Sequence, residues 1–369
     1  MNPTQFLTVC AFAVAGTLSA QEVVSQGFFK APKGVELIAA DLHIHTVFSD
    51  GNVWPTIRVD EARREDLDLI SLTEHLEYQP HKRDIPNPDR NRAFELALRH
   101  RKEGEQLMVV NGSEITRSMA PGHVNAVFIE DANKLMVEDA REALVEANRQ
   151  GAYVFWNHPH WEAQRQDGIA RLEPWHDEVI KAGLLHGIEV VNDLTFSEEA
   201  LQIALDRNLT IMGTSDIHGI ADWQYHIPEG NHRPMTFVLA AERNPDAIKA
   251  ALKSGRTVVW FNDLIVGRAE HVESVLAANV RVEPLTYEVS PRIARVVIHN
   301  DGAQDLNLRY TGPFSFHAHT ELFTVPARGS IELDVKTLEA LDRFDFPVQV
   351  ENSRVAPKTP ATLLLNISK

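Results

Sequence analysis

The stretch VELIAADLHIHT at residues 35–46 decides how the first two thirds of the chain fold. Residues 35–44 form an apolar, strand-like run, and further runs follow with helical stretches between most of them. The further runs cover residues 67–72, 107–110, 124–129, 152–156, 187–191, 209–212 and 235–240, and the helical stretches cover 90–102, 138–149, 198–206 and 245–253. This alternation predicts an α/β fold with a parallel sheet, and the number of units favours a closed or nearly closed barrel.

A change of pattern after about residue 280 indicates a second domain. Residues 306–310, 331–335 and 348–350 alternate apolar and polar side chains, with Gly or Pro turns between them. A period of two is typical of antiparallel strands with one buried face. We therefore expect a barrel over residues 35–265 and a small all-β, sandwich-like domain over residues 280–369.

The first 20 residues carry no charge, and their apolar core ends in small residues at Ser19 and Ala20. This pattern is typical of a signal peptide, which would place the mature protein in the periplasm or outside the cell. A buried N-terminal strand or helix is the alternative. Cys10, the only cysteine, would leave with the signal, so a transition-metal site must use His, Asp and Glu. No later segment is long and apolar enough to span a membrane.

The composition is that of a soluble globular protein, since 44% of the 369 residues are hydrophobic and 24% are charged. The formal net charge of −16 argues against a nucleic-acid partner or an anionic membrane, because phosphate backbones attract clustered Lys and Arg. A small phosphate ester remains a possible substrate if bound metal ions supply positive charge locally.

Ionisable residues gather where the predicted strands end. His43 and His45 are two apart, so they share one side of a strand and can hold one ion together. The accompanying motifs are SDG (49–51), TEH (73–75), GSE (112–114), GH (122–123), NHPH (157–160) and SDIHG (215–219). Strand ends meet at one mouth of such a barrel, so these side chains should meet there. The alternative is that these histidines are buried and hydrogen-bonded to backbone carbonyls instead of binding metal. That alternative explains a single pair better than it explains the whole set. His317 and His319 have no accompanying carboxylates, and we interpret them as a solvated strand face.

This ordered set resembles the PHP family, the polymerase and histidinol phosphatase type of phosphoesterase, and in particular its exported Sb-PDE-type phosphodiesterases. The resemblance covers roughly residues 37–262 and implies a distorted (β/α)7 barrel with two or three divalent ions of Mn, Zn or Fe. The implied ligands are His43, His45, Glu114 and Asp216 for the first ion, Glu114, His123 and His158 for the second, and Asp50, His75 and His218 for the third. Glu74 falls outside this set, and His160 is an alternative to His158.

The implied chemistry is hydrolysis of phosphate esters, above all small phosphodiesters. Two ions that share a carboxylate can also share a water, lower its pKa so that metal-activated hydroxide forms, and neutralise the phosphate. We expect Glu114, Asp216 and His218 to be central to catalysis. The sequence has no GxSxG, P-loop or HExxH motif that would indicate another mechanism. Arg117, Lys82 and Arg83 are candidate phosphate-binding residues, and solvated loop charges are the alternative for each.

Two other functions stay open at this point. One is a phosphomonoesterase of the histidinol-phosphatase type, against which export argues, because histidinol phosphate is a cytoplasmic metabolite. The other is a non-catalytic metal-binding envelope protein, which would have no need for a bridging glutamate. Trp161, Trp223 and Tyr225 follow ligand motifs, and they either line a leaving-group pocket or pack loops together.

Overall fold

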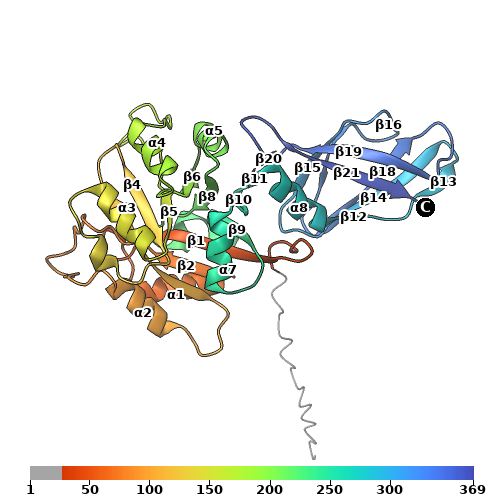
Figure 1. Cartoon of the computed structure of the whole chain (residues 1–369). Helices are drawn as coiled ribbons and strands as arrows, with labels where there is room; N and C mark the ends of the chain where they lie inside the picture. Colours follow the sequence, from red (N-terminus) through yellow and green to blue (C-terminus); the bar gives the residue numbers. More distant parts are fainter. Residues whose placement is uncertain (1–26) are drawn as a thin grey trace, which may run out of the picture.

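A computed structural model describes residues 27–369, so the predicted signal peptide at residues 1–20 lies outside the described part of the chain. A mixed α/β barrel and an all-β domain of two sheets lie side by side (Figure 1). Among the described residues, no helix is long and apolar enough to cross a membrane.

The barrel is built on one sheet that has 12 strands within residues 27–369. Its order is β20-β11-β10-β9-β1-β2-β3-β4-β5-β6-β7, and β8 pairs with β6. The strands are β1 (Glu36–Ile44), β2 (Leu69–Leu72), β3 (Met108–Thr116), β4 (His123–Val127), β5 (Tyr153–Trp156), β6 (Gly187–Asn192), β7 (Thr195–Phe196), β8 (Thr210–Thr214), β9 (Met235–Ala240), β10 (Thr257–Phe261), β11 (Leu264–Gly267) and β20 (Ser353–Arg354). Every strand-like run expected from the sequence overlaps one of these strands.

The sheet is mixed, so the prediction of a parallel sheet is wrong for part of it. β1, β2 and β3 pair in parallel, as do β5, β6 and β8. However, β4 is antiparallel to β3 and β5, and β9 is antiparallel to β1 and β10. Residues 117–122 alone connect β3 to β4, whereas a parallel crossover needs roughly a dozen residues or more. The resulting hairpin places His123 opposite Thr116, at the same mouth as the end of β3.

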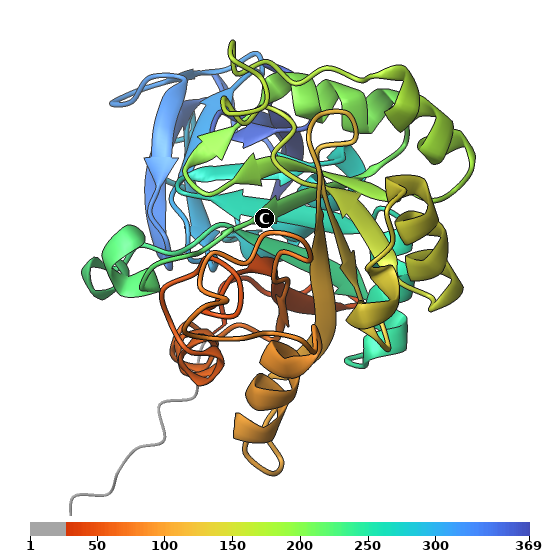
Figure 2. The ribbon, with the colours of Figure 1, turned by 90° about the vertical axis from the view of Figure 1, so that its left-hand side faces the viewer.

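The sheet curls until the chain after β8 meets the end of β1. Ile44 and Ile217 form a parallel bridge. The backbone N–H of Asp216 donates to the carbonyl of His43 at 2.9 Å, and that of His45 donates to the carbonyl of Ile217 at 3.1 Å. The end of β1 and the residues after β8, which both carry predicted ligands, are therefore joined by backbone hydrogen bonds. Figure 2 views the barrel from the side away from the β-sandwich, with helices around the strands.

Helices cover the outside of the barrel, and local signals set their ends. They are α1 (Pro55–Arg64), α2 (Arg92–His100), α3 (Ala140–Arg149), α4 (Pro174–Lys181), α5 (Glu198–Asp206), α6 (Ala221–Gln224), α7 (Pro245–Lys253) and α8 (Ala269–Asn279), with short 3₁₀ helices η1 (Ala132–Leu135) and η2 (Ile227–Glu229). The side chains of Asp139 and Ser197 accept backbone N–H groups at the starts of α3 and α5. α3 then buries a stripe of Ala143, Leu144 and Ala147 against the sheet.

The all-β domain is a sandwich of two antiparallel sheets, as predicted. One sheet contains β12 (Val280–Val282), β13 (Thr286–Ser290), β14 (Ile293–Asn300), β16 (Ser315–Phe316) and β18 (Gly329–Lys336), and the other contains β15 (Leu306–Tyr310), β17 (Leu322–Val325), β19 (Arg343–Val350) and β21 (Ala361–Ser368). Alternate residues of β14 and β19 are buried, which is the pattern of strands with one face toward a core.

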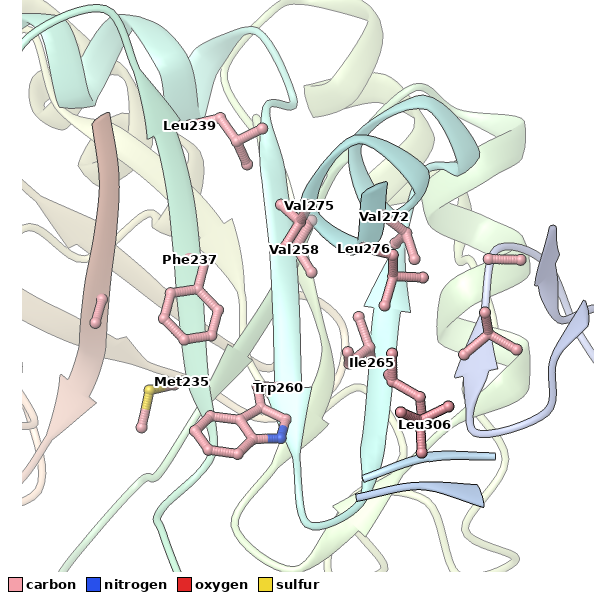
Figure 3. Packing of buried hydrophobic residues seen from close by; sticks show 14 of the residues in the cluster. Met235, Phe237, Leu239, Val258, Trp260, Ile265, Val272, Val275, Leu276 and Leu306 are labelled. Atoms are coloured by element: carbon pink, nitrogen blue, oxygen red, sulfur yellow. The ribbon is translucent and has the colours of Figure 1, made fainter. Parts of the chain in front are cut away.

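The barrel and the sandwich share one hydrophobic core (Figure 3). Trp260 of β10 and Leu306 of β15 belong to the same buried cluster. β20 of the sandwich segment pairs in parallel with β11 and extends the barrel sheet. The Asn352 side chain donates to the carbonyls of Asp263 at 3.0 Å and Asp305 at 2.8 Å. The sandwich is therefore packed firmly against the barrel and is not joined to it by a linker alone.

Candidate metal centre

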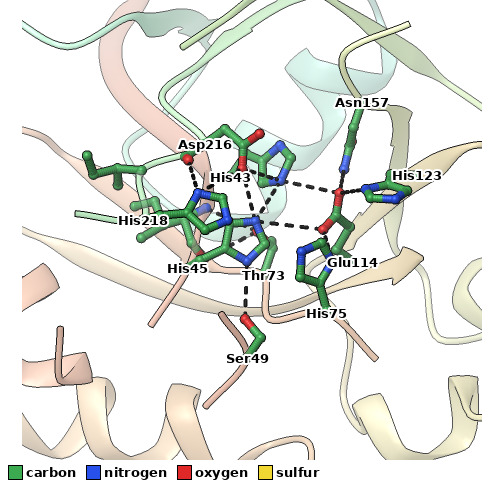
Figure 4. A network of polar contacts seen from close by, with 12 residues as sticks. His43, His45, Ser49, Thr73, His75, Glu114, His123, Asn157, Asp216 and His218 are labelled. Carbon is green, nitrogen blue, oxygen red and sulfur yellow. Dashed lines mark hydrogen bonds and ion pairs between the residues drawn. The ribbon is translucent and has the colours of Figure 1, made fainter. Parts of the chain in front are cut away.

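The predicted ligands converge at one mouth of the barrel, and Figure 4 labels all of them except Asp50 and His158. They come from the ends of β1, β2, β3, β5 and β8, the start of β4 and the loop after β1. Within residues 27–369, three groups have ligand atoms within 4.8 Å of one another: His43, His45 and Glu114; His75, Glu114 and His123; and His45, Asp50, His75 and His218. Glu114 occurs in two groups, and so do His45 and His75, each of which the sequence placed in one.

Glu114 lies at the centre of the cluster and is fully buried. Its Oε1 lies 3.0 Å from Nδ1 of His123, 3.5 Å from Nε2 of His43 and 3.5 Å from Nε2 of His158. Its Oε2 lies 2.5 Å from Nδ1 of His75. One carboxylate thus faces imidazoles on both sides, which is the arrangement that a bridging ligand requires.

Asp216 completes the part of the site built on β1. Its Oδ1 lies 3.2 Å from Nε2 of His43 and 3.0 Å from Nε2 of His45, and these two nitrogens are 3.1 Å apart. The backbone φ is 50° at Asp216 and 26° at His158. Such left-handed conformations cost non-glycine residues about 1–3 kcal/mol each and concentrate at functional sites. Asp216 and His158 are themselves predicted ligands, and this backbone conformation directs their side chains toward the cluster.

Asp50 joins two further histidines at the outer side of the cluster. Its Oδ2 lies 3.3 Å from Nε2 of His75, and its Oδ1 lies 3.2 Å from Nε2 of His218. Gly51 makes this loop possible, because a Cβ there would lie only 2.7 Å from the backbone carbonyl carbon of His45. A larger residue would push the loop that carries Asp50 away from β1.

The residues fit a divalent metal ion. Oε2 of Glu114 and Oδ1 of Asp216 are buried and face only imidazole nitrogens, without a hydrogen bond of ordinary geometry, and such a state is costly for a carboxylate. Both atoms lie within 3.7 Å of Nε2 of His45. Imidazole and carboxylate are the ligand types that Zn, Mn and Fe accept. A cation among these atoms would satisfy all of them at once.

Charges within the cluster shift several pKa values strongly. Burial alone would lower the pKa of His75, but the charges of Glu114 and Asp50 outweigh burial and raise it to about 11. Burial and then the charge of His218 lower the pKa of His45 to about 3. Burial would raise the pKa of Glu114, yet His75 and His123 hold it well below its usual range. The buried carboxylates thus favour positive charge beside them, which a bound divalent ion would supply.

Glu189 on β6 is not among the residues predicted from the sequence, although it orients the centre. It is fully buried, and its Oε1 lies 2.8 Å from Nδ1 of His43. Its Oε2 accepts the backbone N–H of His158 at 2.7 Å and the side chain of Asn192 at 2.9 Å. These bonds turn Nε2 of His43 toward Asp216. The signal in the sequence is a lone charge within the apolar run 187–191.

Two more buried carboxylates support the turns that carry the ligands. Glu74 accepts the hydroxyl of Ser49 at 2.5 Å, next to Asp50, and burial raises its pKa. Asp41 accepts the hydroxyl of Ser215 at 2.5 Å and pairs with the buried guanidinium of Arg233 at 3.1 Å. Glu74 therefore has the supporting position expected of a residue outside the ligand set.

Arg58 on α1 ties the two ligand-bearing segments together from below. Its guanidinium is fully buried and donates to the carbonyl of His45 at 2.9 Å and to that of Ile217 at 3.0 Å. The remaining nitrogen pairs with Glu61 at 2.7 Å. Neither arginine, 58 or 233, is signalled as a site residue by the sequence, because only the fold brings it beneath the cluster.

The predicted phosphate-binding residues do not line the cavity above the cluster. Arg117 pairs with Glu77 and donates to the carbonyl of Val137 at 2.8 Å, so it holds neighbouring loops together. Lys82 and Arg83 are exposed on the long loop between β2 and α2. A role of these three residues in substrate binding stays a prediction.

The remaining candidate histidines, His160, His317 and His319, do not face the carboxylates of the cluster. Nε2 of His160 bonds with the hydroxyl of Thr195 at 2.8 Å, whereas His158 faces Glu114. His317 and His319 are exposed, but they lie on a loop after β16 and not on the strand face predicted for them. The loop follows a strand of only two residues, too short to show an alternating pattern.

A cavity of about 320 Å³ opens above the cluster, and its lining contains no Lys or Arg among the described residues. The Trp161 ring, which is partly exposed, stands at its edge, 5.5 Å from the ring of His123. Tyr225 is buried instead and donates to Asp193 at 3.0 Å, and Trp223 is exposed outside the cavity lining. Of the three aromatic candidates, Trp161 alone lines this cavity.

Comparisons with known proteins identify both domains. A family of Ig-like domains matches residues 280–366, and no curated protein matches at a significant level. The chain is similar to a solved two-domain protein of Bacteroides vulgatus that contains a predicted PHP-like metal-dependent phosphoesterase. The identity is 38%, over 92% of this chain and 97% of that chain, with a TM-score of 0.86. A candidate metal-dependent phosphoesterase of Bifidobacterium adolescentis is 18% identical over 49% of this chain and 87% of its own, with a TM-score of 0.38.

The fold and the His, Asp and Glu cluster define a metal-dependent hydrolase. The chain belongs to the PHP-like metal-dependent phosphoesterases, and it ends in an Ig-like domain. The family resemblance and the fold class expected from the sequence are thereby confirmed.

Proposed function

We propose that the protein is an exported phosphodiesterase that cleaves small diesters with two or three bound Mn, Zn or Fe ions. The single observation that carries the metal assignment is the position of Glu114 between the group of His43 and His45 and the group of His75 and His123. The cavity lining supports a diester over a monoester, because a monoester carries more negative charge and basic side chains usually bind it. Export rests on the signal-like residues 1–20.

The side chains of the cluster have distinct tasks in this proposal. The nine predicted ligands would hold the ions, which when bound lower the pKa of a water and neutralise phosphate oxygens. Glu189 and Asp41 keep their partners oriented, so the centre is ordered before substrate arrives. His218 is 35% exposed and lines the cavity, while its Nδ1 lies 2.7 Å from the carbonyl of Asp216. Its Nε2 lies 3.2 Å from Oδ1 of Asp50 and is therefore the atom that would hold an ion at the cavity wall.

Activity on two chromogenic esters tests the proposal. With Mn or Zn added, we expect kcat/KM for bis(p-nitrophenyl) phosphate to exceed that for p-nitrophenyl phosphate by about tenfold or more. Chelator-treated protein should be inactive and should recover when metal is returned. A preference for the monoester would indicate a phosphomonoesterase, and no turnover of either ester with any of these metals would reject the proposal.

Metal content distinguishes the groups within the cluster. His218 belongs to the group around Asp50 alone, so His218→Ala should lose at most one ion per chain, measured by mass spectrometry after dialysis. His75→Ala should lose more metal, because His75 also belongs to a group that contains Glu114. His317→Ala, at the exposed HxH pair, is the control and should keep the full content. Equal losses in the first two variants would contradict this grouping.

A further inference from the structure

A second cavity, of about 640 Å³, lies between the barrel and the Ig-like domain, and we call it the interdomain groove. Tyr225 and Trp260 line it from the barrel, and Gln304 and Ala327 line it from the Ig-like domain. Gln224 lines both this groove and the cavity above the metal centre. The two spaces therefore share a wall.

Gln224 and the residues hydrogen-bonded to it form the shared wall. Nε2 of Gln224 donates to Oδ1 of Asp193 at 2.5 Å, and the Tyr225 hydroxyl donates to the same oxygen at 3.0 Å. Asp193 lines the cavity above the metal centre, and the next residue, Leu194, lines the interdomain groove. A substrate whose phosphate is bound at the cluster thus has the groove directly beyond Gln224.

The interdomain groove has a fixed shape. The His232 ring stacks on the indole of Trp260 with centroids 3.5 Å apart, and its Nε2 lies 3.0 Å from the carbonyl of Asn262. On the other side, the Gln304 side chain donates to the carbonyl of Asp263 across the domain boundary. Because these walls are ordered in advance, a ligand that binds there loses little free energy to ordering the protein.

The lining of the interdomain groove matches hydroxyl groups better than a second phosphate. No Lys or Arg lines it among the described residues, and its polar side chains include the amides and carboxylates of Gln224, Asn231, Asn262, Gln304, Asp263 and Asp305. Amides and carboxylates pair with hydroxyls, whereas carboxylates repel an anion.

We propose that one alcohol arm of the diester lies in the interdomain groove, and that this arm is uncharged and rich in hydroxyl groups, as in a sugar or polyol. The proposal rests on the proposed phosphodiesterase function and adds the class of substrate. It also assigns a role to the Ig-like domain, which would supply one wall of the substrate site.

Filling the interdomain groove tests the proposal. Ala327→Trp adds an indole to its Ig-like wall, and Ala318→Trp adds the same group at an exposed position outside the groove. The probes are p-nitrophenyl myo-inositol phosphate and p-nitrophenyl ethyl phosphate, which both release p-nitrophenol. For Ala327→Trp we expect an increase of about tenfold in KM for the inositol ester, with kcat and both constants for the ethyl ester within about twofold. Ala318→Trp should change neither probe.

A second variant keeps the test decisive if Ala327→Trp fails to fold. Asn231→Ala removes one rim amide without adding bulk, and it should raise KM for the inositol ester by about threefold while sparing the ethyl ester. Equal changes for both esters would overturn the groove assignment. A larger effect on p-nitrophenylphosphocholine would show that the groove takes a cationic arm and would overturn the uncharged class. Failure of the wild type to cleave any diester would instead reject the proposed function, and the groove proposal with it.

Discussion

Glu114→Gln is expected to lower phosphoesterase turnover by on the order of a thousandfold, which corresponds to about 4 kcal/mol of barrier. The amide keeps the shape of the side chain but removes the one charge that faces imidazoles on both sides of the cluster. Because Glu114 belongs to two of the three ligand groups, the variant should also retain less metal from more than one group. Turnover and metal content per chain, measured on the same preparation, check both parts.

Two matched variants separate the loss of a bridging charge from a general effect of the substitution. Glu130→Gln changes an exposed glutamate in the barrel and should keep activity and metal. Glu189 contacts the centre through the His43 side chain, whereas Glu114 faces imidazoles on both sides. Glu189→Gln should therefore lose less turnover and less metal than Glu114→Gln. Near-normal metal content and turnover in Glu114→Gln, with an unchanged melting temperature, would reject a bridging role for this residue.

Arg58→Leu is expected to destabilise the protein by roughly 3–5 kcal/mol, because it removes the nearest cation of the buried Glu61 carboxylate and leaves only Arg233, 3.9 Å away. It also removes the donors to the carbonyls of His45 and Ile217, so the two ligand-bearing segments lose their common support. Urea denaturation at equilibrium measures the change in free energy of unfolding. Metal titration of the folded variant should show weaker binding as well.

Arg64→Leu is the control on the same helix. Its guanidinium is half exposed and pairs with Asp222 on the surface, where an ion pair contributes at most about 1 kcal/mol. A stability loss in Arg58→Leu no larger than in Arg64→Leu would show that the buried guanidinium does not hold the mouth of the barrel together.

The strands and the ligand motifs could be predicted from the sequence because both are local patterns. An apolar run that ends in two histidines specifies a strand, a face and a strand end without knowledge of the partner. The expected helices at residues 198–206 and 245–253 coincide with α5 and α7, whose starts are capped by Ser197 and Asn244. Caps and strand patterns of this kind depend only on neighbouring residues, so contacts made elsewhere in the fold do not alter the elements that they predict.

The supporting network could not be predicted, because its contacts join residues that are far apart in the chain. Arg58 bonds across 159 positions to Ile217, and Arg233 reaches Asp41 across 192 positions. Each looks in the sequence like an ordinary surface charge, and only the fold makes it a buried partner. Glu189 differs, since a charge inside an apolar strand is itself unusual. The direction of β4 was also recoverable, from the short connection before it.

The pairing of β20 with β11 has a consequence for association between chains. Without β20, β11 would be the end of the barrel sheet, with apolar side chains and unpaired backbone groups on Leu264–Gly267. Exposed edges of this kind recruit strands from other molecules and lead to aggregation. The two residues of β20 pair with this edge and cover it. The Ig-like domain therefore packs beside the barrel and also lowers its tendency to self-associate through β11.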